Sequence, residues 1–318
     1  MRIFVAGATG AIGRPLVAKL VRAGHTVFGL TRSPEKAALL REIGAEPVVG
    51  DALDPAAIHA AVHAARPDVI VHELTDLSGT LDLRKFDRAF AASNRLRTLG
   101  TDHLLAAARG AGVQRVIAQS FCGWPYARAG GYVKSETDPL DPDPPRGMRG
   151  ALEAIRHLET AVVSSWPIEG VVLRYGGFYG PGTGAFDRGV IDQVRGRRIP
   201  LIGGGTGWWS FIHVDDAADA TVAAIERGSG IYNVVDDEPA PVRVWLPALA
   251  DMLGAKPPFR APVWLARILA REPLVVMMTE SRAGSNHKAK SELGWRPQHA
   301  SWRDGFAKIL RSEHRLAA

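Results

Sequence analysis

The segment that decides the fold is Arg2-Ile3-Phe4-Val5-Ala6-Gly7-Ala8-Thr9-Gly10-Ala11-Ile12-Gly13, at the start of the chain. Its first five residues form a short apolar run typical of a buried parallel strand, and apolar residues recur at helical spacing from Pro15 to Ala23. Gly7 allows a sharp turn off the strand, Gly10 leaves room for a pyrophosphate beside the backbone, and Gly13 lets the helix pack closely on the strand. The free N–H groups and positive dipole end of that helix suit phosphates. The segment therefore predicts a dinucleotide site.

The composition is that of a soluble globular protein. The chain has 318 residues, of which 46% are hydrophobic and 23% charged. The net charge is +6, but the 39 Lys and Arg residues are scattered, which argues against nucleic acid binding. The single cysteine, Cys122, excludes an internal disulfide and fits a reducing compartment. No apolar run approaches the ~20 residues that a membrane span needs, and no signal peptide precedes the first strand. We therefore expect a cytoplasmic protein that binds neither nucleic acid nor membrane.

Strands and helices alternate through the first half of the chain. Further strands are expected at residues 26–30, 45–49, 67–72, 113–119 and 170–174. Helices are expected between them at residues 34–43, over most of 81–110, and at 148–164. This order predicts an α/β fold, a Rossmann-type doubly wound parallel sheet. We expect residues 1–180 to form the NAD(P)-binding domain. Residues 181–318 should form a smaller, mixed α/β substrate-binding region interleaved with the first.

Residues at the ends of the second and third strands are expected to contact the adenosine half of the cofactor. An acidic residue after the second strand accepts a hydrogen bond from a free ribose 2′-hydroxyl, whereas an Arg suits a 2′-phosphate. This chain has Thr31-Arg32-Ser33 there and no acid until Glu35, so NADP is favoured over NAD. Asp51, after the third strand, is the candidate acceptor for the adenine amino group.

Several segments together resemble the extended short-chain dehydrogenase/reductase family, the NAD(P)-dependent epimerase/dehydratase group. They are the glycine turn, Asp51, Val69-Ile70-Val71-His72, the segment Leu173–Gly182 with its Tyr179-Gly180-Pro181-Gly182, and Phe211–Asp216 with Ile231–Val234. The resemblance covers nearly the whole chain and implies that the residues after His72 run past the cofactor. The expected cofactor-binding residues are Gly7, Thr9, Gly10, Ala11, Ile12, Gly13, Arg32, Asp51, Ala52, Glu73 and Leu74.

The chain departs from this family in its proton-transfer residues. Family members usually carry Tyr-x-x-x-Lys on the helix after a proline-rich loop, where the Lys lowers the pKa of the Tyr. The tyrosines here are residues 126, 132, 175, 179 and 232, and none is followed four residues later by Lys. If Glu159 matches the acid that follows the motif, Ala151 and Ile155 occupy the two catalytic positions. The chain therefore resembles an atypical member of the family, which lacks the standard Tyr-x-x-x-Lys pair.

Three hydroxyl groups are candidates to replace that pair. Ser120 lies at the end of the fifth expected strand, although in another register Cys122 takes its place. Tyr126 follows Ser120, and Tyr175 lies at the end of the next strand, so either phenol could face the nicotinamide. We expect Tyr126 to be the donor and Ser120 its partner, with Tyr175 next in line. No His, Cys, Asp or Glu spacing suggests a metal.

Three functions remain open from the sequence. The first is an NADP-dependent oxidoreductase or epimerase-like enzyme acting on a small carbonyl, alcohol or sugar-nucleotide substrate with a non-standard proton donor. The second is a non-redox isomerase or lyase on the same fold, and the third a non-catalytic sensor of NADP(H). The resemblance also implies a homodimer formed by the helices near residues 82–109 and 148–164, where Leu104, Leu105, Ile155 and Leu158 suggest apolar faces to bury.

Overall fold

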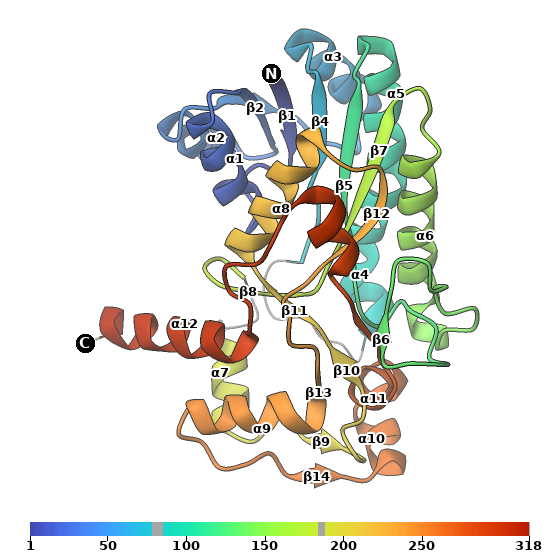
Figure 1. Cartoon of the computed structure of the whole chain (residues 1–318), viewed down its shortest axis with the longest axis vertical. Coiled ribbons are helices and arrows are strands. Elements are labelled where there is room, and N and C mark those ends of the chain that lie inside the picture. Colours follow the sequence, from blue (N-terminus) through green and yellow to red (C-terminus); the bar gives the residue numbers. More distant parts are fainter. Residues whose placement is uncertain (78–84, 184–187, 318) are drawn as a thin grey trace.

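The centre of the molecule is a sheet of seven parallel strands, seen in a computed structural model that describes residues 1–77, 85–183 and 188–317 (Figure 1). Across the sheet the strands are β12 (Gly230–Val234), β7 (Glu169–Tyr175), β5 (Arg115–Phe121), β4 (Val69–His72), β1 (Arg2–Ala6), β2 (Thr26–Thr31) and β3 (Glu46–Val49). The order reverses direction at β1 and β4, so a crevice opens there at the carboxyl ends of the strands. This is the predicted doubly wound α/β fold.

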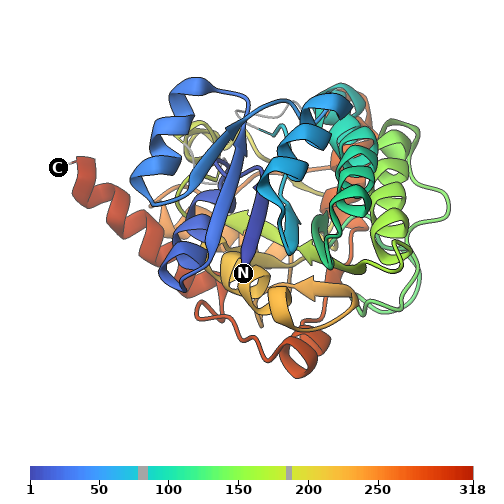
Figure 2. The same ribbon diagram turned by 90° about the horizontal axis from the view of Figure 1, so that it is seen from above.

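Helices cover both faces of the sheet (Figures 1 and 2). One face carries α1 (Gly13–Arg22), α2 (Pro34–Glu42) and α8 (Val214–Glu226). The other carries α3 (Pro55–Ala65), α5 (Thr101–Ala111) and α6 (Arg149–Val163). The remaining helix beside the sheet, α4 (Phe86–Arg95), runs through a π-helical turn at Leu96–Gly100 into α5. Because both faces are covered, the central strands are apolar on both sides.

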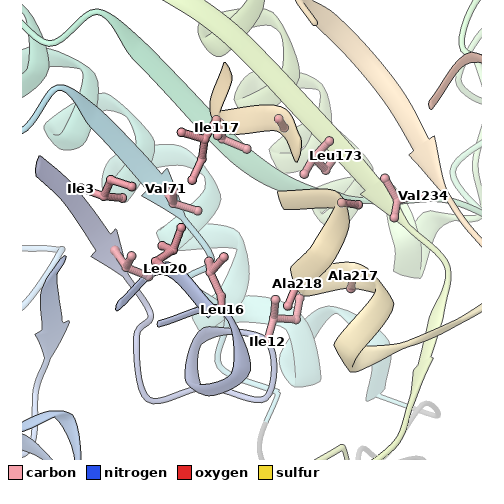
Figure 3. Packing of buried hydrophobic residues seen from close by; sticks show 14 of the residues in the cluster. Ile3, Ile12, Leu16, Leu20, Val71, Ile117, Leu173, Ala217, Ala218 and Val234 are labelled. Atoms are coloured by element: carbon pink, nitrogen blue, oxygen red, sulfur yellow. The ribbon is translucent and has the colours of Figure 1, made fainter. Parts of the chain in front are cut away.

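The larger core lies between the sheet and the pair α1 and α8 (Figure 3). Leu16 and Leu20 of α1 and Ala217 and Ala218 of α8 pack on Ile3, Val71, Ile117 and Leu173, and all eight side chains are fully buried. The small side chains of α8 let it approach the sheet closely beside α1. This packing fixes the amino end of α1 above the ends of β1 and β4.

A smaller lobe stands at the carboxyl ends of the strands, at the bottom of Figure 1. It contains α7 (Arg188–Arg195), α9 (Val242–Met252), α10 (Val263–Leu269), α11 (Arg271–Thr279) and α12 (Trp302–Ala317). Short pairs of strands complete it: β9 (Leu201–Ile202) with β14 (Arg260–Ala261), and β10 (Trp208–Trp209) with β13 (Ala240–Pro241). Two further pairs lie at its junction with the sheet: β8 (Gly177–Tyr179) with β11 (Phe211–His213), and β6 (Val133–Lys134) with β15 (Ala283–Gly284). Although α8 and β12 follow residue 180, they belong to the sheet layer, so the chain crosses between the two parts more than once.

The apolar residues that suggested a dimer face lie inside the molecule. Leu104, Leu105 and Leu158 belong to the core between the sheet and α5 and α6, and Ile155 packs in a cluster with Phe86 and Trp124. All four of the predicted residues are at most 3% exposed, so that reason for expecting a dimer was wrong. The homodimer itself stays a prediction. No helix in the described part of the chain is long and apolar enough to cross a bilayer.

Close packing between the glycine turn and its neighbours positions α1. A Cβ atom on Gly13 would lie 2.1 Å from the carbonyl oxygen of Gly7, whereas a Cβ atom on Gly10 would meet only that same oxygen, at 3.2 Å. Gly7 has a φ of +95°, and a Cβ atom there would lie 2.6 Å from the carbonyl oxygen of Glu73. Gly7 and Gly13 are therefore required by the fold, and Gly10 is not.

This geometry predicts that Gly13→Ala is much more destabilising than Gly10→Ala. The added methyl at residue 13 must push α1 off β1, and overpacking of this kind costs about 1–3 kcal/mol or more. At residue 10 the methyl would meet only the Gly7 oxygen, at 3.2 Å, so a shift of a few tenths of an ångström accommodates it and we expect a change of less than about 1 kcal/mol. Urea unfolding of the two variants measures the difference, and equal midpoints would contradict it.

Candidate functional site

A cleft of about 450 Å³ opens at the carboxyl ends of the strands, where the strand order reverses. Each of the residues predicted to bind the cofactor lies in its wall, from Gly7 in the glycine turn to Leu74 after β4. The structure thus brings together segments that follow β1, β2, β3 and β4. It also adds lining residues that the sequence analysis missed, chiefly Lys36, Gln119 and Phe178.

The middle of the cleft is formed by the glycine turn and the amino end of α1. Gly10 is exposed there, and beyond the oxygen of Gly7 a Cβ atom on it would meet nothing within 4 Å. No side chain caps the amino end of α1, and its first turn contains no acid. Backbone N–H groups that are uncapped at a helix amino end favour an anion. The turn therefore fits a pyrophosphate.

One end of the cleft combines two cations with one carboxylate. Arg32 follows β2, Lys36 lies in the first turn of α2, and Asp51 follows β3. Ser33 caps α2 by accepting a hydrogen bond from the Lys36 N–H at 3.3 Å, and its hydroxyl donates to Glu35 at 2.5 Å. The cap brings Lys36 to the same side as Arg32. A pattern search for the residue after β2 finds Arg32 but overlooks a lysine on the next helix.

The opposite end of the cleft is lined by Glu73, Gln119 and Phe178. Glu73 is 5% exposed, and burial raises the pKa of its carboxyl to about 8. The Tyr175 hydroxyl lies 3.2 Å from Glu73 Oε1, and the hydrogen bond between them limits the rise of the pKa. Glu73 Oε2 is buried without a hydrogen-bond partner. Sequence reasoning placed Glu73 beside the cofactor but gave no role to its carboxyl group.

Tyr126 lies inside the protein, away from the cleft wall. Its side chain is fully buried, its hydroxyl donates to Asn233 Oδ1 at 2.6 Å, and it accepts from Arg174 Nη1 at 3.0 Å. Burial raises the pKa of its hydroxyl above the ordinary value. Both hydrogen-bonding capacities of the phenol are used within the fold, so this geometry does not support Tyr126 as the proton donor.

Ser120 belongs to the same buried polar network. Its hydroxyl donates to Glu159 Oε1 at 2.7 Å, and Glu159 also accepts from Arg174 Nε at 2.7 Å and Nη2 at 2.6 Å. Cys122, the alternative to Ser120, is buried too, and burial raises the pKa of its thiol to about 12. Neither residue lines the large cleft.

Tyr175 is the third predicted hydroxyl, and it lies behind Glu73. It is fully buried, with its oxygen 2.6 Å from Thr221 Oγ1 of α8 and 3.2 Å from Glu73 Oε1. Burial and the Glu73 carboxyl raise the pKa of this phenol well above its usual value. Tyr175 can therefore reach the cleft only through Glu73. The structure does not bring the three hydroxyls together as one catalytic set.

The helix face where the family pair was sought is apolar. Ala151 and Ile155 of α6 are buried and pack with Phe86, Trp124 and Met148. This cluster has no place for a phenol and an ammonium group one turn apart. Among the described residues that line the cleft there is no tyrosine, and the lysine is Lys36 at the opposite end from Glu73.

The fold and the cleft define a Rossmann-type enzyme of the class that uses nicotinamide dinucleotides. The model of the NAD dependent epimerase/dehydratase family matches residues 3–234, and the chain belongs to that family. The predicted family and the predicted fold class are therefore confirmed. The prediction that the chain belongs to a class of NAD(P)-dependent enzymes is confirmed as well.

Relatives that match over nearly the whole chain agree with this family, and a solved structure agrees with the fold. A Streptomyces protein named 3-diazoavenalumate denitrifying reductase is 46% identical over 313 residues, covering 97% of this chain and 100% of that protein. A Stigmatella aurantiaca ketoreductase named for 4-hydroxy-2-methyl-3-oxo-4-farnesyl-3,4-dihydroquinoline-1-oxide is 30% identical, covering 93% of this chain and 92% of its own. UDP-glucose 4-epimerase from Thermotoga maritima, solved with UDP-glucose, shares the fold over 100% of both chains, with a TM-score of 0.78 and 22% identity.

We predict that the two cations near β2 select a 2′-phosphate. Charge-assisted hydrogen bonds contribute roughly 1.5–3 kcal/mol, so Arg32→Ala should weaken NADPH binding about tenfold or more and leave NADH binding nearly unchanged. Lys36→Ala should have the same selectivity with a smaller effect. Calorimetric titration with both cofactors measures this, and equal losses for NADPH and NADH would show that the cations do not contact the phosphate.

For Tyr126 we predict a structural effect in place of a catalytic one. Tyr126→Phe leaves Asn233 Oδ1 and Arg174 Nη1 each without its buried hydrogen-bond partner, which should lower the free energy of unfolding by about 1–3 kcal/mol. Turnover per folded molecule should change less than about threefold. A loss of about a hundredfold, the usual scale for removing a general acid, would restore Tyr126 as the donor.

Proposed function

We propose that this protein is an NADPH-dependent reductase that delivers hydride to the diazonium group of an aromatic acid. The two nitrogen atoms of that group then leave as dinitrogen. The observation that carries the proposal is the absence of a tyrosine–lysine pair from the described cleft wall and from the buried face of α6. The 46% identity to the diazoavenalumate denitrifying reductase over nearly the whole chain supplies the substrate class. The coarser function, an NAD(P)-dependent enzyme of the epimerase/dehydratase family, follows from the family itself.

Hydride transfer to a diazonium group needs no proton donor at the acceptor atom. The cation accepts the hydride pair at its terminal nitrogen and becomes a neutral aryl diazene. The N–H and C–N bonds of the diazene then break, hydrogen is placed on the ring carbon, and dinitrogen leaves. The sum is one diazonium cation and one NADPH giving one arene, one dinitrogen and one NADP⁺. A carbonyl substrate instead forms an alkoxide that must be protonated at once, which is the task of the missing pair.

Different residues of the cleft would bind different parts of NADPH. The glycine turn and the amino end of α1 would hold the pyrophosphate, and Arg32 and Lys36 the 2′-phosphate, while bound NADPH would supply the hydride. Leu74, Leu96 and Phe178 give the opposite end of the cleft apolar walls. Those walls would limit the access of water, which otherwise hydrolyses a reactive diazonium group.

A ketoreductase is the second candidate. It is favoured by the 30% identical ketoreductase and by Glu73, a carboxyl group with a raised pKa in the cleft wall that could protonate an alkoxide. The non-redox and sensor functions remain as outcomes of the tests below. A homodimer and a preference for NADP over NAD are likewise proposals.

The stoichiometry of the reaction tests the proposed function. With a ¹⁵N-labelled arenediazonium carboxylate, made by diazotising 3-amino-4-hydroxybenzoate, we expect one NADPH oxidised for each labelled dinitrogen released and each arene formed. Mass spectrometry of the gas and absorbance of the cofactor give the two rates. The Arg32→Ala variant serves as the control, because its NADPH dependence should shift while the ratio of products stays the same.

Other outcomes separate the alternatives. Oxidation of NADPH by a panel of ketones, without turnover of the diazonium compound, would establish the ketoreductase and contradict the proposal. Binding of NADPH with no turnover of either class would favour the sensor.

A further inference from the structure

We propose that Glu73 is a proton switch for the cofactor: its carboxyl group is neutral beside reduced nicotinamide and gives up its proton when the oxidised, cationic ring occupies the cleft. The inference rests on the proposed binding of a nicotinamide dinucleotide, and it goes beyond the proposed reaction because it concerns the affinity of the two redox forms. Three observations on Glu73 carry it: its position, its hydrogen bonds and the charges around it.

Its position follows from the order of the strands. Residues after β2 and β3 form the end of the cleft with Arg32 and Asp51, and the glycine turn after β1 forms the middle. A dinucleotide bound with its adenosine at Arg32 and its pyrophosphate at the turn must place the nicotinamide beyond the turn, where β4 and β5 end. Glu73 and Gln119 stand there. The Glu73 N–H donates to the Ala6 carbonyl at 2.8 Å, which fixes Glu73 beside the turn.

The hydrogen bonds behind Glu73 fit a neutral carboxyl group. The Thr221 hydroxyl donates to the Ala217 carbonyl at 2.9 Å, so its oxygen can accept the phenol hydrogen of Tyr175 at 2.6 Å. The phenol oxygen then needs a donor, and a protonated Glu73, whose Oε1 is 3.2 Å away, would donate to the phenol in place of accepting from it. An ionised Glu73 would accept a hydrogen bond from the Tyr175 phenol. The Thr221 hydroxyl would then have to donate to Tyr175 and give up its hydrogen bond to the Ala217 carbonyl. The three hydroxyl-bearing groups therefore have two complete arrangements, one for each state of Glu73.

The surroundings of Glu73 make its ionisation depend on a cation. Tyr175 from β7 and Thr221 from α8 face the carboxyl group, and neither residue carries a charge at neutral pH. Burial is the main cause that raises its pKa to about 8, and no basic side chain among the described residues opposes it. Glu73 Oε2 has no partner among the described residues. An opposite charge within about 4–6 Å lowers a carboxyl pKa by about 1–3 units, and the oxidised ring is such a charge.

The proposal fixes the direction in which the affinity for NADP⁺ changes with pH. Because NADP⁺ favours ionised Glu73, its affinity should rise with pH up to about 8, the pKa of Glu73 without the cation, and level off above it. The affinity for NADPH, which has a neutral ring, should lack this step. The 2′-phosphate also titrates near pH 6, but it does so in both forms and cancels in their ratio. Hydride transfer itself would then release a proton from Glu73 to solvent.

The test uses the two cofactors alone, with the full chain. Calorimetric titrations between about pH 6 and about pH 9 give the ratio of the NADP⁺ to the NADPH dissociation constant, which should fall about tenfold or more as pH rises. In buffers of different ionisation enthalpy, NADP⁺ binding at pH 7 should release about 0.4–0.9 proton and NADPH binding almost none. Glu73→Gln keeps the shape of the side chain and should remove both effects.

Asp76→Asn is the matched control, because Asp76 lines the same cleft two residues beyond Leu74. This variant should keep the pH dependence and the proton release. In infrared difference spectra, a band of a protonated carboxyl group should disappear on binding NADP⁺ in the wild type and be absent from Glu73→Gln.

The proposal would be overturned if the ratio of the two dissociation constants in the wild type did not change with pH. It would also be overturned if Glu73→Gln kept the pH dependence of this ratio, or if Asp76→Asn alone lost it. Failure to bind either cofactor would overturn both the switch and the proposed function. Normal linkage without turnover of a diazonium compound would contradict only the proposed reaction.

Discussion

The cleft depends on the contact between two glycines at its centre. Gly13 lies so close to the carbonyl oxygen of Gly7 that no side chain fits between α1 and β1, and Gly7 is in turn closed in by the backbone of Glu73. This contact places the uncapped amino end of α1 over the switch in strand order. The cleft walls at Arg32 and Lys36 and at Glu73 and Gln119 are then set on either side of the same turn.

The hydroxyl groups of Ser120 and Tyr126, which the sequence favoured for proton transfer, are part of the protein's interior. Glu159 and Arg174 form an ion pair at 2.6 Å with side chains about 5% exposed, and Ser120 and Tyr126 satisfy their remaining hydrogen bonds. A buried pair of this kind is tolerated only when its lone pairs and hydrogens are nearly all used. Such a network holds β5, β7 and α6 together and uses the hydroxyls of Ser120 and Tyr126 within the fold. A substrate that accepts hydride without a proton at the acceptor atom is compatible with it.

The sequence predicted the fold, and it predicted residues that line one cleft, because both follow from local rules. Strand, glycine turn and helix are contiguous, and Arg32 and Asp51 follow strands whose carboxyl ends must meet at one edge. It failed for Tyr126 and Ser120 because position along a strand does not tell which partners satisfy a hydroxyl; those partners, Asn233 and Glu159, are distant in sequence. Lys36 and Phe178 were missed for a similar reason, since the first turn of α2 and the short strand β8 bring them to the cleft. The apolar residues assigned to a dimer face pack inward. Helical spacing alone cannot tell an apolar face that packs in the core from one that packs against a second subunit.

The central claim is that hydride is delivered where no tyrosine, serine or lysine can donate a proton to the acceptor atom. A crystal structure of the protein with NADP⁺ and an unreactive aryl azo or nitrile analogue of the diazonium acid tests it most directly. We predict that the atom facing nicotinamide C4 has no hydroxyl or ammonium group within about 3.2 Å, the limit of a normal hydrogen bond, and that the Glu73 side chain lies beside the ring. A tyrosine, serine or lysine donor within that distance of the acceptor atom would contradict the account.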